Sequence, residues 1–392
     1  MPFLNTTKIL YNFFSSEKSG GFILIACTFA SILITNISNG DAYLHFWQTD
    51  INLSFSAIQL DYPLEFWVND GLMAIFFLMA GLEIERELYI GELSDFKNAL
   101  LPILAAIGGM AIPALFHLFF NHGRATQSGI GIPMATDIAF ALGILSLVGN
   151  KIPPSIKIFL TALAIIDDIG AVIIIAIFYT KNLSIIYLVI ALGIFALLLI
   201  FNKLKVTKLF LYIIPGIVMW YFMLKSGVHA TISGIMLAFA IPFKNNSDNL
   251  SVRLMHFLHK PVTFFILPVF ALANTCIILS AGWHRTLLHD NSIGIIAGLL
   301  LGKPIGILLS CFLAVWLKVC KLPENMRWGH LLGAGVLAGL GFTMSIFITN
   351  LAFDNEELIK KSKIAVLTAS ALAGLLGFCL LRKINNKKQQ TS

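Results

Sequence analysis

Two adjacent carboxylates, Asp167 and Asp168, lie in an otherwise apolar run from Ala162 to Ile175. A charge at membrane depth costs roughly 2.5 kcal/mol or more, so intramembrane carboxylates usually mark ion or proton sites. The alternative is a pair near a helix end whose side chains reach back to water. Apolar residues on both sides of the pair favour the ion or proton site.

Other ionisable residues also lie within apolar segments. Asp137 and Lys303 are well inside theirs, and Asp70 is nearer the outer end of its segment. An isolated buried charge is strongly disfavoured, and pairing reduces the cost. We therefore expect Lys303 to pair with one of the aspartates.

Helix-breaking residues accompany these charges. Pro133 precedes Asp137, Pro304 follows Lys303, and glycines crowd the segment 333–341. Unwound backbone at membrane depth is tolerated only where it lines a cavity or is buried in protein. The ends of broken helices carry partial charges, which Asp137 and Lys303 could neutralise. Close helix packing through small residues is the alternative explanation for the glycine-rich segment.

The oxygen atoms at these positions suit a hard monovalent cation. Such an ion prefers oxygen ligands, and Asp167, Asp168 and Thr136 supply carboxylates and a hydroxyl. Neighbouring residues on a helix point about 100° apart, so one aspartate can face the cation and the other Lys303. A carboxylate removed from water beside a second carboxylate binds a proton more readily. Competition between a proton and a cation for one site, with access alternating across the membrane, predicts exchange transport.

The composition is that of a membrane protein. The 392 residues are 58% hydrophobic and 12% charged, with a mean hydropathy of +0.86, whereas soluble domains carry about 25% charged residues. The five cysteines are scattered, which indicates neither a metal site nor a disulfide framework. The net charge of +7 does not indicate nucleic-acid binding, because the basic residues lie in loops between apolar segments.

Apolar segments of spanning length predict an all-α integral membrane protein with about twelve transmembrane helices. We expect one transmembrane domain over 1–392, with short tails at about 1–18 and 382–392, and a first helix that is retained rather than cleaved as a signal peptide. The predicted segments are 20–38, 62–84, 99–120, 127–148, 155–179, 183–201, 207–222, 227–242, 256–279, 291–317, 328–352 and 360–381.

The distribution of lysine and arginine predicts the orientation. With the N-terminus inside, 19 of the 27 basic residues face the cytoplasm and seven face outward, while Lys303 belongs to neither side. This bias favours both termini in the cytoplasm of a multi-pass inner-membrane protein.

The first outer loop, 45–58, alternates apolar and polar residues near its end, which predicts a short hairpin. An isolated two-stranded hairpin is marginal in water, so pairing with a second copy would favour a homodimer. A loop whose aromatic residues rest on lipid headgroups is the alternative.

Several motifs, in one order along the chain, resemble the bacterial NhaA sodium/proton antiporters. The resemblance implies inverted repeats, formed by helices three to five and ten to twelve, and two interrupted helices, the fourth and eleventh, that cross at mid-membrane. It runs from about the first predicted helix to the twelfth. The matching segments are 135–143, 164–168, 224–231, 302–304 and 341–347.

The resemblance implies a secondary transporter rather than an enzyme, one that exports Na+ or Li+ in exchange for protons. It makes Asp167 and Asp168 the ion-site pair, Asp137 and Lys303 the charge-compensating pair, and Thr136 the threonine at the crossing point. Thr136 would be a further Na+ ligand. If each Na+ displaces two protons, transport would carry net charge and be electrogenic. No cofactor is expected.

The resemblance also implies a cytoplasmic pH-sensing cluster. Its members would be Glu83, Arg86, Glu87, His229, His256 and His259. Two residues depart from the best-known members of the family: Met255 replaces a glutamate and Glu85 replaces a lysine. These changes leave the pH profile open. The alternative for His256 and His259 is a solvated helix start.

Rival functions are disfavoured for chemical reasons. An intramembrane aspartyl protease needs two aspartates that face each other from different helices, which adjacent residues cannot do. A passive cation channel is disfavoured because Lys303 would repel the ion. A sodium-coupled symporter for an organic solute is the main alternative.

Overall fold

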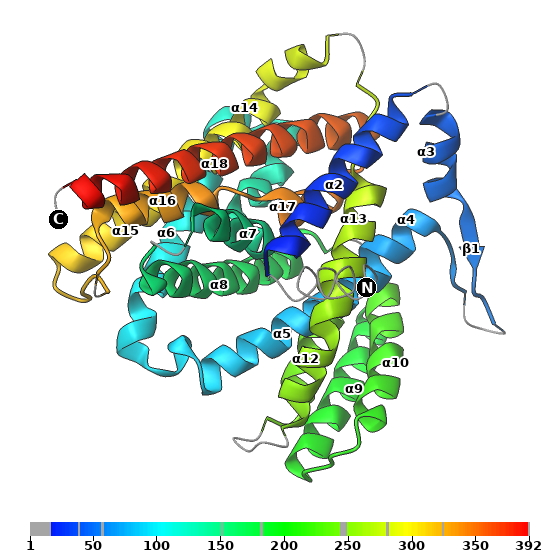
Figure 1. The fold of residues 1–392 in the computed structure, drawn as a ribbon. Helices are drawn as coiled ribbons and strands as arrows, with labels where there is room; N and C mark the ends of the chain where they lie inside the picture. Colours follow the sequence, from blue (N-terminus) through cyan, green and yellow to red (C-terminus); the bar gives the residue numbers. More distant parts are fainter. Residues whose placement is uncertain are drawn as a thin grey trace, which may run out of the picture. The chain divides into compact units, whose positions relative to one another are not determined.

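The computed structural model describes residues 17–37, 40–55, 59–149, 152–180, 183–243, 249–279, 282–323 and 325–390. These residues are largely helical (Figure 1), as the sequence predicted. The chain forms two compact units, each assembled from separated stretches of sequence. The expected tail 1–18 lies almost entirely outside the described residues, and the single-domain organisation stays a prediction.

Unit 1 comprises Met1–Ala26, Asp95–Ala171 and Ser280–Ser392. It contains the first part of α2 (Glu17–Thr35), most of α8 (Pro154–Phe178), and the following further elements: α6 (Phe96–Asn121), η3 (Ala125–Met134), α7 (Ile138–Val148), η5 (Trp283–Leu288), α14 (Asp290–Ala297), η6 (Gly298–Gly302), α15 (Lys303–Trp316), α16 (Trp328–Ala338), α17 (Phe342–Ala352) and α18 (Glu356–Gln390).

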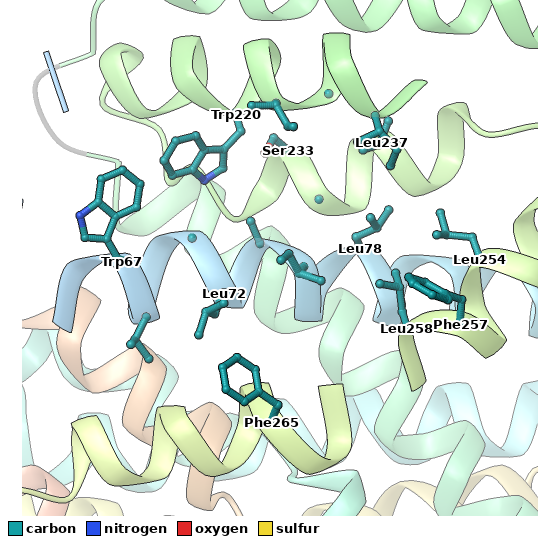
Figure 2. Close-up of a pocket in the computed structure, with 18 of the residues that line it drawn as sticks. Trp67, Leu72, Leu78, Trp220, Ser233, Leu237, Leu254, Phe257, Leu258 and Phe265 are labelled. Carbon is teal, nitrogen blue, oxygen red and sulfur yellow. The ribbon is translucent and has the colours of Figure 1, made fainter. Parts of the chain in front are cut away.

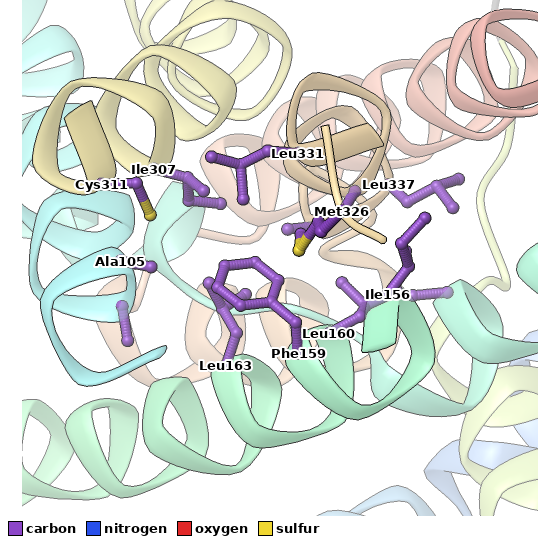
Figure 3. Close-up of a cluster of buried hydrophobic side chains, with 14 of the residues drawn as sticks. Ala105, Ile156, Phe159, Leu160, Leu163, Ile307, Cys311, Met326, Leu331 and Leu337 are labelled. Atoms are coloured by element: carbon purple, nitrogen blue, oxygen red, sulfur yellow. The ribbon is translucent and has the colours of Figure 1, made fainter. Parts of the chain in front are cut away.

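A buried apolar cluster fills the centre of unit 1 (Figure 3). Phe159, Leu160 and Leu163 of α8 face Ile307 of α15 and Leu331 of α16. α6 and α15 approach each other closely because two glycines meet: a Cβ atom on Gly306 would collide with the backbone of Gly108. This packing fixes the helices that carry Asp167 and Lys303.

Unit 2 comprises Cys27–Ser94 and Val172–Leu279. It contains the ends of α2 and α8 and the following further elements: α3 (Gly40–Gln48), β1 (Asp50–Asn52), β2 (Asp61–Pro63), α4 (Leu64–Phe66), η1 (Trp67–Leu72), α5 (Met73–Tyr89), η2 (Glu92–Ser94), α9 (Ile185–Lys203), α10 (Phe210–Ser226), α11 (Ile232–Ala240), α12 (Leu250–Pro261), η4 (Val262–Ile266) and α13 (Leu267–Asn274).

Unit 2 surrounds a cavity of about 1250 Å3 that is almost wholly apolar (Figure 2). Trp67 and Trp220 stack beside it with ring centroids 6.2 Å apart. Arg253 is the one charged side chain that lines it among the described residues. The cavity therefore offers a small cation no carboxylate ligand.

Each of the twelve predicted segments overlaps a helix or a run of consecutive helical elements. Seven helices in the described part of the chain are long and apolar enough to span a bilayer, or up to ten if each bent pair counts as one span. The helix α11 is nine residues long and would cover only about 14 Å at 1.5 Å per residue. A multi-span membrane protein is confirmed, and the number twelve stays a prediction.

The predicted outer hairpin is present with different bounds. β1 and β2 pair antiparallel, with Asp50 opposite Pro63 and Ile51 opposite Tyr62. The second strand therefore lies beyond the predicted range 45–58. The beginning of that range is helical, because α3 continues to Gln48. Residues 56–58 lie outside the described part of the chain.

Candidate functional site

The first helix break lies between η3 and α7. η3 ends at Met134, α7 begins at Ile138, and the two axes differ by 43°. Asp137 caps α7, since its Oδ1 accepts a hydrogen bond of 3.0 Å from the backbone N–H of Phe140. A carboxylate at a helix N-terminus offsets the partial positive charge there.

The second break lies between α16 and α17. α16 ends at Ala338, α17 begins at Phe342, and their axes differ by 45°. Gly339 is required by close packing, because a Cβ atom there would collide with the carbonyl oxygen of Leu299. The glycine-rich segment thus serves both interpretations drawn from the sequence, a broken helix and close packing.

The two breaks are hydrogen-bonded to each other. The backbone N–H of Asp137 donates to the Leu340 carbonyl over 2.6 Å, and the Thr136 hydroxyl lies 2.8 Å from the Ala338 carbonyl oxygen. The hydroxyl and N–H of Thr343 both donate to Asp137 Oδ2, over 2.5 and 3.1 Å. These contacts join two interrupted helices at their breaks, as the predicted fold requires.

Lys303 and Asp167 meet beside the first break. Lys303 Nζ lies 2.7 Å from Asp167 Oδ2, and neither side chain is exposed to solvent. The ammonium also donates to the carbonyl oxygen of Met134, the last residue of η3. The expectation that Lys303 pairs with an aspartate agrees with this geometry, which also places its charge at a helix C-terminus.

Thr136 connects this ion pair to the second break. Its hydroxyl oxygen lies 2.7 Å from Asp167 Oδ2 and 2.8 Å from the Ala338 carbonyl oxygen. A hydroxyl has one proton to donate, so it can donate to only one of these acceptors at a time. Which acceptor the hydroxyl chooses links the ionic state of Asp167 to the hydrogen bonding of the Ala338 carbonyl in α16.

Asp168 follows Asp167 on α8 and is also buried, with 6% of its surface exposed. The two carboxylates point in different directions from one helix. Asp167 Oδ2, the Thr136 hydroxyl and the Ala338 carbonyl oxygen make an oxygen-rich region, and a small hard cation prefers oxygen ligands. In the described part of the chain, no group of three or more His, Cys, Asp or Glu side chains is placed to hold a metal ion.

Hydroxyl side chains that the sequence did not single out complete the region. Ser345 donates to the Ile132 carbonyl over 2.6 Å, which ties α17 to the last turn of η3. Ser370 of α18 accepts a hydrogen bond of 3.1 Å from the backbone N–H of Phe342 at the start of α17. With Thr343, these residues hold both breaks. The sequence signal that could have identified these residues is a serine or threonine beside glycines in an apolar segment.

The predicted pH-sensing residues of α5 and α12 lie in unit 2. His259 Nδ1 is 4.0 Å from Glu83 Oε1, so the two attract when the imidazole is protonated. Glu87 accepts a hydrogen bond of 3.1 Å from the backbone of Glu92. Arg86 and His256 are exposed on the same two helices.

His229 lies away from these residues. It follows α10, and its Nε2 is 3.1 Å from the Tyr179 carbonyl oxygen. α11 packs along α5, with Gly234 against Ala74. Because Ala74 precedes Glu83 by nine residues, the beginning of α11 is about 14 Å from Glu83 along the helix axis. His229 is therefore near the end of α5 that is opposite to Glu83.

The two departures from the family pattern are both buried. Met255 is 5% exposed, and Glu85 is 3% exposed. Ser251 donates to Glu85 Oε2 over 2.8 Å. An uncharged hydrogen-bond donor thus satisfies the carboxylate at 85, and an apolar side chain occupies 255.

Comparison with known proteins gives one consistent result. Residues 11–381 match the family described as Na+/H+ antiporter 1. The chain is 57% identical over 382 residues to a Na+/H+ antiporter NhaA of Flavobacterium psychrophilum, covering 97% of both chains. It is 54% identical over 380 residues to that of Cytophaga hutchinsonii, covering 97% of this chain and 96% of the relative. For Dechloromonas aromatica the identity is 56% over 380 residues, with 96% of both chains covered.

The chain is extensively helical, its two interrupted helices are joined at their breaks, and these relatives cover nearly its whole length. It therefore belongs to the Na+/H+ antiporter family of bacterial membrane transporters.

Proposed function

We propose that this protein exports Na+, or Li+ in its place, from the cytoplasm in exchange for protons. Asp167, Asp168 and Thr136 would bind the ion, and Asp137 and Lys303 would balance the charges of the helix breaks. The observation that carries the proposal is the buried contact of 2.7 Å between Lys303 and Asp167. The ammonium of Lys303 and a Na+ ion would both be attracted to the carboxylate of Asp167. Each would therefore weaken the binding of the other.

Competition at this pair would set the number of protons. In the sodium-free state the ammonium of Lys303 neutralises Asp167, and Asp168 carries a proton. When Na+ enters, one proton leaves Asp168 and a second leaves the Asp167–Lys303 pair. Two protons would then move for each Na+, and transport would carry net charge.

The joined breaks would couple the site to alternating access. Thr136 and Asp137 contact the break between α16 and α17 on both of its sides. A change at Asp167 therefore acts on two broken helices through one short stretch of chain. Bending at the breaks would open the site to one side of the membrane and then to the other.

Regulation and assembly form the rest of the proposal. Glu83, Arg86, Glu87, His256 and His259 would sense cytoplasmic pH, with His229 acting from the far end of α5. The protein would lie among the lipids of the bacterial inner membrane as one transmembrane domain, with both termini in the cytoplasm. Pairing of the β1–β2 hairpins of two copies would form a homodimer.

Everted membrane vesicles with a pH-sensitive dye test the exchange. Respiration acidifies the vesicle interior, and addition of NaCl or LiCl should then release protons, whereas KCl should not. Vesicles with Asp168→Asn protein at equal expression serve as the matched control. Sodium-coupled symport, the alternative, would instead show sodium uptake only when an organic solute is added, with no proton release by sodium alone.

A further inference from the structure

Unit 1 has a second polar site, remote in sequence from the ion pair. A cavity of about 300 Å3 is lined by three stretches of chain: 124–126, 289–292, and positions 358 and 361. The basic side chains Arg124, His289 and Lys361 line it, and Asp290 is the one carboxylate in its lining among the described residues. The charge bias predicts that these loops face outward.

The beginning of α14 opens into this lining. His289 precedes the helix in an extended conformation, with φ −72° and ψ 144°, and its side chain makes no capping hydrogen bond. The first main-chain bond of the helix runs from Ile293 N–H to the His289 carbonyl. The N–H groups of residues 290–292 therefore lack helical acceptors, an arrangement that favours an anion.

A buried hydroxyl gives independent support for a ligand. Ser292 lines the cavity, has no exposed surface, and its Oγ has no hydrogen-bond partner among the described residues. A buried polar group without a partner is costly, so an acceptor in the cavity would relieve that cost.

The cations retain donors for such a ligand. Arg124 pairs with Asp290 through one Nη atom, and a guanidinium has five N–H donors. Lys361 lies 2.7 Å from Glu357, one turn earlier on α18, and an ammonium has three donors. Both cations therefore keep N–H donors that their ion pairs do not use.

A buried polar network holds the lining in place. Asn121 accepts from Thr126 over 2.6 Å and donates to the Asp290 carbonyl over 3.2 Å. Asn291 donates to Ser362 over 2.7 Å. The three lining stretches are thus tied together beneath the cavity, which keeps their donors arranged before any ligand binds.

His117 adds a fixed donor to this network. Its Nε2 lies 3.1 Å from Asn291 Oδ1, which accepts because the amide nitrogen of Asn291 already donates to Ser362. The side chains of His117 and Asn121 have no exposed surface. The network therefore belongs to the protein interior, and the cavity is its outer boundary.

We propose that this cavity binds a phosphate group, either as free inorganic phosphate or as the headgroup of a phospholipid. A tetrahedral oxyanion can accept from N–H groups at the start of α14, from Ser292 and from the two cations at once. Its binding would tie the start of η3 to α14 and α18. The inference does not depend on the transport proposal.

The test uses the purified full chain after exchange into a phosphate-free, delipidated detergent buffer. One arm adds potassium phosphate and follows thermal unfolding, with potassium chloride at matched ionic strength as the control for screening. The other arm adds phosphatidylglycerol and measures the mass of the adduct by native mass spectrometry. The two arms separate free phosphate from a lipid source.

Two variants and one matched control decide the outcome. Lys361→Gln should weaken binding about tenfold or more, the usual effect of losing a charged hydrogen bond, and Ser292→Ala about fivefold. Lys360→Gln removes the neighbouring lysine of α18, which pairs with Glu356 at 4.0 Å and does not line the cavity, so binding should remain as in the wild type. Absence of binding in both arms, stabilisation equalled by chloride, or equal affinities of Lys361→Gln and Lys360→Gln would overturn the proposal.

Discussion

The ammonium of Lys303 and the carboxylate of Asp167 form an ion pair of 2.7 Å from which solvent is completely excluded. Lys303 begins α15 directly after the irregular element η6, and Asp167 lies in the middle of α8. Such a pair is stable only while both partners are present, because either charge alone would be buried without compensation. In the proposed exchange, this pair is therefore where a competing cation should have its largest effect.

Amide replacement of the adjacent carboxylates should abolish exchange. Asp167→Asn and Asp168→Asn each remove a titrating oxygen and keep the shape of the side chain, so the protein should still insert, although Asp167→Asn also leaves the buried ammonium of Lys303 without its partner and should lower stability. Sodium-induced proton release in everted vesicles should fall to background for both. Asp61→Asn, in the exposed part of β2, should behave as wild type. Normal exchange by Asp168→Asn protein would exclude it from the ion site.

Removal of the buried ammonium should destabilise the protein in a pH-dependent way. Lys303→Ala leaves Asp167 buried without its partner, which should lower the free energy of unfolding by about 3 kcal/mol when that carboxylate is charged. At acid pH the carboxylate takes a proton, so the loss should be smaller. Thermal unfolding at several pH values and the apparent KM for Na+ measure these effects.

An exposed lysine provides the comparison for this variant. Lys360→Ala, half-exposed on α18, should change stability by less than about 0.5 kcal/mol. If Lys303→Ala had equally small effects on stability and on the KM for Na+, the ion pair would have no role in the exchange.

The Thr136 hydroxyl should be needed for more than its size. Thr136→Val keeps the shape but leaves the buried Ala338 carbonyl without this donor, which should cost about 1–3 kcal/mol. It also removes one proposed Na+ ligand, so the KM for Na+ should rise. Thr136→Ser retains the hydroxyl and should preserve both properties. Equal behaviour of the valine and serine variants, in unfolding and in exchange, would contradict this role.

The charged residues of the site and the Thr136 hydroxyl could be predicted from sequence, and the other hydroxyls around them could not. Asp167 and Lys303 stand out because charges are rare in apolar segments. Serine and threonine are common in such helices, where they usually donate to the carbonyl four residues earlier, as Thr349 does to Ser345. Sequence does not show that Ser345 instead reaches Ile132, because that contact depends on how the broken helices meet.

The outer hairpin shows a related limit. Alternation of apolar and polar residues predicted strands within 45–58, yet Gly40–Gln48 is helical and the second strand is Asp61–Pro63. Only the end of that range alternates, so the pattern marked neither the helical start nor the second strand. The register of so short a hairpin depends on the contacts around it, such as the 3.4 Å bond from Trp67 to the Ile51 carbonyl.

Exchange of two protons for one Na+ should make transport respond to voltage. Each cycle would move one net positive charge inward as Na+ leaves, so a potential that is negative inside should drive sodium export. At 100 mV this adds about 2.3 kcal/mol per charge, a factor of about fifty in the sodium gradient at equilibrium. Reconstituted protein on a voltage-clamped membrane should give a sodium-dependent current, and its absence during active exchange would refute the two-proton count.

Met255 should make the pH response shallower than it would be with a glutamate at this position. Met255 is buried on α12, four residues before His259, which in turn lies 4.0 Å from Glu83. A glutamate at 255 would add a titrating carboxylate within one helical turn of this pair, and more coupled groups give a steeper response. Exchange by Met255→Glu should therefore fall more steeply toward acid pH, or at a different pH, than exchange by the wild type.

An uncharged variant separates charge from polarity at this position. Met255→Gln has the size and polarity of the glutamate variant and no titrating group, so its profile of exchange rate against pH should follow the wild type. Glu85→Lys, which restores the other family residue, would leave Ser251 without its carboxylate partner and should shift the profile further when combined with Met255→Glu, because the two new charges attract. Identical profiles for wild type, Met255→Gln and Met255→Glu would show that position 255 does not set the response, and would move the search for the sensor to His229 and its contact with Tyr179.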